Sequence, residues 1–150
     1  MATKSKIEDF LSQQKIAVVG VSRNSKKFGN IVYKDLKKKG YLVFPINSKV
    51  WEIEGDPCFP SVDVLPEKVD GVVFITQPEQ TEKILVDVEK SGIKRAWLQQ
   101  GAESEKAIHY CEEKNIDCIY DECIMMFAEP VESFHKFHRW IWKIFGKLPK

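Results

Sequence analysis

The side chains with the most chemical potential in this sequence lie in one stretch, GVSRNSKKFGN, at residues 20–30. An apolar run ends at Gly20, and a second glycine, Gly29, stands where a helix can begin. Backbone amides at a helix start, together with the helix dipole, favour an anion such as a phosphate. We predict that this loop holds a phosphate, although many parallel α/β proteins turn in this way without a ligand. The side chains that would add charge or hydrogen bonds are Ser22, Arg23, Asn24, Lys26, Lys27 and Asn30.

The sequence argues against ordinary NAD binding. That fingerprint needs GxGxxG and then an acidic residue at the end of the second strand, which binds the ribose diol. The chain has GVS at residues 20–22, and its second apolar run ends in PIN at residues 45–47, without a carboxylate. No GxxxxGK[ST] phosphate-binding loop is present either. Asn47, Lys49 and the basic first loop suit an adenosine that carries phosphates.

Two other groups of residues have side chains that can do chemistry. Cys123 follows two acidic residues and could form a mixed disulfide or sense redox state. Carboxylates do not lower a thiol pKa, so we favour a packed, inert cysteine. Glu132, His135 and His138 share one helical stripe, but a di-iron bundle needs two such halves, and zinc-type spacing is absent. We therefore assign no metal ligand and no catalytic residue.

These loops must be positioned by a regular framework of strands and helices. Five apolar, β-branched runs predict buried strands, at residues 15–21, 41–46, 71–76, 94–99 and 116–120. Helical spacing or capping signals lie before and between them, at about residues 5–13, 28–40, 76–92 and 103–114. The alternation predicts a Rossmann-like, doubly wound α/β fold with a mostly parallel five-stranded sheet and helices on both faces.

Two further features of this framework are expected from the sequence. Ser5 and Thr76 are the expected helix caps. In the long irregular segment 47–60, Trp51 and Ile53 are expected to hold the chain against the core. In such sheets, ligands bind beyond the carboxyl ends of the strands. The predicted site is therefore formed by the loops that follow the predicted strands. These loops are residues 20–30, 45–49, 76–78, 99–104 and 121–126.

The bulk properties indicate a single domain over residues 1–150. With 23 basic and 22 acidic side chains, nothing favours nucleic-acid binding. The four cysteines form no CxxC pair, and MATKSKIEDF lacks the apolar core of a signal peptide, so we expect reduced thiols and a cytoplasmic protein.

A separate prediction concerns the C-terminal segment. The pattern VESFHKFHRWIWKIF predicts an amphipathic helix over about residues 129–146. Because apolar residues occupy much of its circumference, it should bury more than one face. Packing on its own sheet is the default, with a homodimer, a protein partner or a membrane surface as alternatives. The chain has no run of the ~20 apolar residues that a transmembrane helix needs.

Six motifs together carry a family resemblance: VGVSRNxxKFGN, YxVFPIN, GxxCFPS, DGVVFITQP, GIKRAWLQQGAES and ECIM. The set resembles the stand-alone coenzyme A-binding proteins, which are similar to the coenzyme A-binding Rossmann domain of the succinyl-coenzyme A synthetase α subunit. The likeness covers about residues 12–126, the core of the domain. The second domain of that synthetase, with its phosphorylated histidine, has no counterpart here, so no acyl-phosphate chemistry is implied.

The resemblance implies where parts of the cofactor would lie. Thr76 and Pro78, with Gln77 between them, would line the path of the pantetheine arm toward Cys123. Gln99 and Gly101 would sit at the next strand end. The pyrophosphate region would be held by Gly20, Ser22, Lys27, Phe28, Gly29 and Asn30, with Arg23 and Asn24 beside them. The adenosine would be flanked by Pro45, Asn47 and Lys49.

The sequence therefore predicts a protein that binds coenzyme A or an acyl-coenzyme A as a carrier, sensor or regulatory module, without catalysis of its own. An NADP-type reductase, or an acyl-transfer enzyme completed by a partner, is the alternative. A structural interaction protein centred on the aromatic tail is a third hypothesis. We also expect Gly29→Val to block ligand binding and to leave the fold largely intact.

Overall fold

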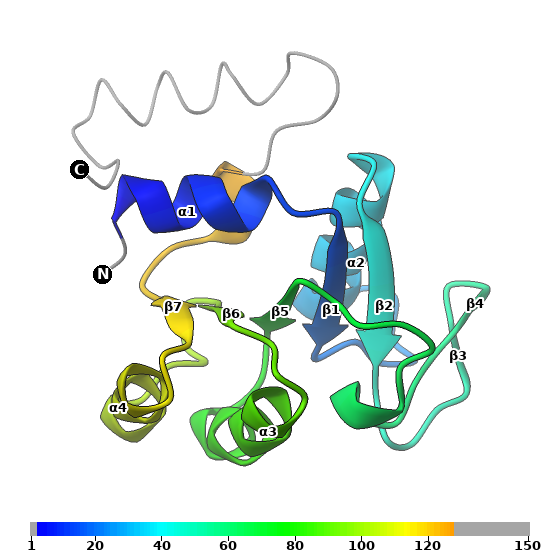
Figure 1. The fold of residues 1–150 in the computed structure, drawn as a ribbon. Coiled ribbons are helices and arrows are strands. Elements are labelled where there is room, and N and C mark those ends of the chain that lie inside the picture. The colour runs from blue at the N-terminus through cyan, green and yellow to red at the C-terminus, as the bar shows by residue number, and fades with distance from the viewer. Residues whose placement is uncertain (1–2, 128–150) are drawn as a thin grey trace.

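One parallel sheet forms the centre of the molecule. The computed structural model describes residues 3–127, and Figure 1 shows its ribbon. The strands lie in the order β2-β1-β5-β6-β7, and all neighbouring pairs are parallel. They are β1 (Lys15–Val19), β2 (Leu42–Ile46), β5 (Gly71–Phe74), β6 (Arg95–Leu98) and β7 (Asp117–Ile119). The predicted fold class is confirmed.

Within residues 3–127, four helices cover the two faces of this sheet. Figure 1 shows α1 on one side of β6 and β7, with α3 and α4 side by side on the other. The helix that connects β1 to β2, α2, shares the face of α1. The helices are α1 (Lys4–Leu11), α2 (Phe28–Lys38), α3 (Pro78–Lys90) and α4 (Glu105–Glu113). Each lies within or close to a segment that the sequence predicted as helical.

Alternating side chains of the strands build two cores. Ile16 and Val18 of β1 point to the core under α1 and α2, whereas Ala17 and Val19 point to the core under α3 and α4. All four are at most 4% exposed. Because both faces of a parallel strand are covered, the strand is apolar at successive positions, and the unbroken apolar runs in the sequence are explained.

Two predicted helix caps are wrong. The first helix begins at Lys4, and the Thr3 side chain accepts a hydrogen bond from the Lys6 amide at 3.3 Å, so Ser5 lies inside the helix. The third begins at Pro78, whose fixed φ suits the first helical turn. Thr76 lies before that start, and its hydroxyl instead pairs with the Thr81 hydroxyl at 2.7 Å.

The segment between β2 and β5 is more regular than expected. It contains an unpredicted hairpin of β3 (Glu52–Ile53) and β4 (Asp56–Pro57). A 3-10 turn at Val62–Val64 follows, within residues 61–69, where the sequence predicts a short helix. Ile53 is buried, as predicted. The prediction for Trp51 is wrong, since this side chain is 89% exposed. The strands were missed because two residues are too few to show an alternating pattern.

The predicted C-terminal helix at residues 129–146 lies outside the described residues, as does the histidine stripe at residues 132–138. The last described element is a 3-10 turn at Ile124–Met126. Among residues 3–127, no helix has the length and apolar character needed to span a membrane.

Candidate functional site

A crevice opens where the strand order reverses. β2, the next strand of the sheet in sequence, lies on one side of β1, and β5 lies on the other side of β1. In open α/β sheets, ligands bind at this switch point, beyond the carboxyl ends of the strands. The structure has a cavity of about 450 Å³ there, bounded by the ends of β1, β2 and β5, by residues 60–62 and by α3. This volume lies in the range of small-molecule sites.

The cavity combines apolar and polar walls. Val19, Ile46, Val62 and Ile84 contribute apolar surface from four different elements. Four of the predicted ligand-binding residues line the same cavity. They are Gly20, Asn47, Lys49 and Thr76. The structure thus brings together predicted residues from three separate loops, although whether they contact a ligand stays a prediction.

The two glycines of the first loop are required by close backbone packing. Gly20 has a φ of +115°, and a Cβ there would lie 2.1 Å from the Ile75 carbonyl oxygen. A Cβ on Gly29 would lie 2.1 Å from the carbonyl oxygen of Gly20. The start of α2 therefore rests directly on the end of β1. The expectation that Gly29→Val leaves the fold largely intact is therefore wrong, because any side chain at this position must displace the backbone of the loop. The expected loss of ligand binding stays a prediction.

Side-chain amides hold the first loop in shape. Asn30 is 1% exposed, and its carbonyl accepts from the Ser22 amide at 2.8 Å. The amide group of Asn30 donates to the Ser22 carbonyl at 2.7 Å and to Glu54 at 3.3 Å. In the same way, Asn47 donates to the Val21 carbonyl at 2.8 Å. We assign both asparagines a role in positioning the loop, and direct contact between them and a ligand stays a prediction.

The cationic side chains around the crevice have no carboxylate partners in the described part of the chain. Arg23, Lys27 and Lys49 are exposed, and none forms a salt bridge there. Arg23 and Asn24 line a second, more open hollow, which shares Asn47 and Lys49 with the first. The segment 20–30 contains three basic residues and no acid. The charge available for an anion is therefore local, although the whole chain carries a net charge of only +1.

The other predicted residues lie outside the cavity lining. Gln99 is 4% exposed, and its side-chain carbonyl accepts from the Ile124 amide at 3.1 Å, which links the end of β6 to the turn after β7. Cys123, in that turn, is half-buried. Pro45 is paired with Val18 inside the sheet. Phe28, Gln77, Pro78 and Gly101 likewise do not line the cavity.

Sequence reasoning missed the wall that α3 contributes. Gln80, Lys83, Ile84 and Asp87 lie on one face of this helix and line the cavity. Their spacing is helical, so the stripe was visible in the sequence. The rule that ligands bind beyond the strand ends selects only the loops that follow strands, and this face of a helix belongs to none of them. Ser61 was missed as well, whereas Ser48 lies within the predicted loop 45–49.

The geometry defines a class of protein, the Rossmann-like α/β proteins with a polar, locally cationic crevice at the switch point of the sheet. The chain matches the model of the CoA binding domain family over residues 14–129. It belongs to this family. No group of His, Cys, Asp and Glu among residues 3–127 is arranged to hold a metal ion.

The relatives include both short proteins and large ligases. The chain is 27% identical over 134 residues to Acetate--CoA ligase [ADP-forming] I of Archaeoglobus fulgidus, covering 83% of this chain and 20% of that protein. It is 28% identical to the uncharacterized protein YneT of Bacillus subtilis, covering 81% and 91% of the two chains. A solved structure, a conserved hypothetical protein from Pyrococcus furiosus, is 41% identical with a TM-score of 0.72, covering 75% and 97%. The chain thus spans about a fifth of the ligases that it matches.

Proposed function

We propose that this chain binds coenzyme A or an acyl-coenzyme A in the switch-point crevice and acts as a carrier, sensor or regulatory module without catalysis of its own. The observation that carries the proposal is the composition of the crevice, a cavity with apolar and polar walls that is edged by the start of the first loop and by Lys49. Membership of the CoA binding domain family supports the choice of cofactor.

Each part of the cofactor has a suitable surface. The first backbone amides of α2 and the basic side chains of residues 20–30 would neutralise the pyrophosphate. The apolar side chains Val19, Ile46 and Ile84 would contact the adenosine. The pantetheine arm would run past Thr76 toward the ends of β6 and β7, where Gln99 and Cys123 lie.

The end of β2 argues against NAD. The residue at the position of the ribose-binding acid is Asn47, whose amide group donates to the Val21 carbonyl. A side chain in this arrangement closes the loop and offers no carboxylate to a ribose diol. An NADP-type reductase would need a cation for the 2′-phosphate and not this acid, so binding measurements must separate NADPH from coenzyme A.

Isothermal titration of the purified chain with coenzyme A, NADPH and ATP in parallel tests the proposal. We expect saturable binding of coenzyme A and much weaker binding of NADPH and ATP. Preferential binding of NADPH would favour the reductase alternative. Absence of binding to all three would contradict the proposed function. The cytoplasmic location and a homodimer or protein partner remain predictions.

A further inference from the structure

The crevice has cations on two separate walls. On one side stands Lys49, with Gly20 and Val21 at the start of the first loop. On the other side stands Lys83, from the second turn of α3. A pyrophosphate held by the first loop does not need a cation from α3, so the function of Lys83 is left open by the proposed function.

The ammonium group of Lys83 is available to a ligand. It forms no salt bridge within the described residues, and it is exposed. Its neighbour Glu82 is engaged elsewhere, since it accepts from the Ser104 hydroxyl at 2.7 Å and lies 4.0 Å from Lys106. Asp87, one turn further along α3, is the one acid among the described residues that line the cavity, and it does not pair with Lys83.

A cofactor with phosphates at two positions of one ribose fits this arrangement. Because the ribose is small, both of its phosphate groups must lie in or beside the same cavity. They are attached at different ribose carbons, so they point in different directions and meet different walls. A phosphate monoester carries about −1.5 to −2 charges at neutral pH and is bound well by a lysine acting as a point charge. A pyrophosphate at the first loop would leave a second phosphate to meet the opposite wall.

We propose that Lys83 recognises the ribose 3′-phosphate of coenzyme A and so selects the 3′-phosphorylated cofactor over dephospho-coenzyme A. This inference rests on the proposed function. Asp87 limits how far along α3 this phosphate can lie, because a phosphate placed one turn beyond Lys83 would be repelled by the Asp87 carboxylate. The two side chains together would place the phosphate near the second turn of α3.

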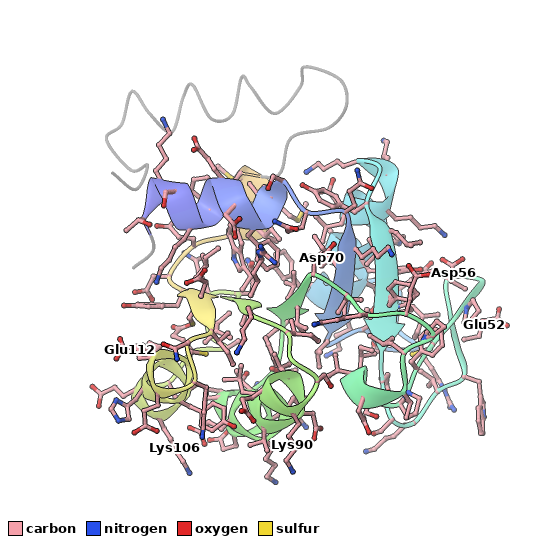
Figure 2. All side chains as sticks on the ribbon, viewed as in Figure 1. Glu52, Asp56, Asp70, Lys90, Lys106 and Glu112 are labelled. Atoms are coloured by element: carbon pink, nitrogen blue, oxygen red, sulfur yellow. The ribbon has the colours of Figure 1, made fainter. Side chains whose placement is uncertain are left out.

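The test measures the affinities of coenzyme A and dephospho-coenzyme A by isothermal titration in reducing buffer. For Lys83→Gln we expect about a tenfold loss of coenzyme A affinity and less than about a twofold change for dephospho-coenzyme A. Asp87→Asn should strengthen coenzyme A binding by about twofold. The matched control is Lys90→Gln, which removes the same charge from the same helix. Figure 2 shows Lys90 on the side of α3 that points away from the sheet.

The outcomes separate the two proposals. If the wild-type chain binds neither cofactor, the proposed function fails and the role of Lys83 fails with it. If the wild-type chain binds coenzyme A but Lys83→Gln weakens both cofactors equally, or neither, only the role of Lys83 is overturned. An equal loss in Lys90→Gln would show a general effect of charge and would also overturn it. Thermal melts of each variant exclude misfolding as the cause.

Discussion

At the scale of single residues, Glu122 is the most deeply buried acid among residues 3–127. Its side chain is 5% exposed, and no residue of the described part of the chain donates a hydrogen bond to its carboxylate. Burial raises the pKa of this carboxyl, and nearby Asp121 adds to the effect. The ionised form is therefore more costly in the folded chain than in the unfolded chain.

We expect Glu122→Gln to raise the melting temperature by about 2–4 °C at about pH 8. The free energy of unfolding of the wild-type chain falls as the pH rises above the ordinary glutamate pKa, because the buried carboxyl must then ionise. The gain should shrink toward about pH 4, where the carboxyl is protonated. Thermal melts at both pH values measure this. Glu112→Gln, an exposed acid on α4 (Figure 2), is the control, and an equal gain there would contradict the explanation.

The cysteines differ sharply in accessibility. Cys58, Cys111 and Cys118 are at most 8% exposed. Burial raises the pKa of Cys58, and the pKa of Cys118 is raised by its hydrogen bond with Cys111 and by burial. Cys123 is half-buried, which makes it the accessible thiol.

We therefore expect about one thiol per chain to react quickly with Ellman's reagent in the native protein and all to react after denaturation. Cys123→Ser should remove the fast phase and leave the slow phase unchanged. Fast reaction of two or more thiols in that variant would show that the core opens readily. Pre-incubation with coenzyme A would slow the reaction of Cys123 if the pantetheine arm passes it, as proposed.

At the scale of elements, two carboxylates of the β3–β4 hairpin contact α2. Glu54 accepts from Asn30 at 3.3 Å and lies 3.9 Å from Lys34. Asp56 accepts a hydrogen bond from the Tyr33 hydroxyl and lies 2.5 Å from the Lys37 ammonium. These two donors, Lys37 first, lower the pKa of Asp56. Figure 2 labels Asp56 and Glu52 on this hairpin. The hairpin in turn fixes the segment that leads into residues 60–62 of the cavity wall.

We expect Asp56→Asn to lower the free energy of unfolding by about 1 kcal/mol at neutral pH, because both hydrogen bonds weaken when the charge is removed. The contribution of Asp56 is fully present above the ordinary aspartate pKa and is lost as the pH falls through the lowered value. Urea unfolding at several pH values measures both effects. Glu52→Gln, on the same hairpin and exposed, should change little. A loss that persists unchanged in acid would point to packing instead of charge.

The elements also show what the sequence could and could not determine. The five strands and the helices between them were predictable, because apolar runs and helical spacing extend over four or more residues. The hairpin was not, since Glu52–Ile53 and Asp56–Pro57 are too short to show a pattern. The contact between Gly29 and Gly20 was not predictable either, because it depends on how α2 docks on β1.

At the scale of the whole molecule, the crevice joins two parts of the chain that are far apart in sequence. The first loop and Asn47 belong to the β1–α2–β2 half, whereas Thr76 and Lys83 belong to the half that begins with β5. The loops were predictable from the rule that ligands bind beyond the strand ends. The wall from α3 was not assigned, because it depends on the position of a helix face relative to loops of the other half.

A ligand that occupies this crevice should stabilise both halves at once, because it binds the native arrangement of the two and not the unfolded chain. We expect saturating coenzyme A to slow amide hydrogen exchange in residues 20–30, 45–49 and 76–87 together, as followed by mass spectrometry. Residues of α4 lie away from the cavity lining and should exchange as in the free protein. Protection restricted to the first loop would show that the phosphates bind without the opposite wall. Protection that instead centred on α4 would place the ligand outside the switch point, and the crevice would then be a feature of the fold alone.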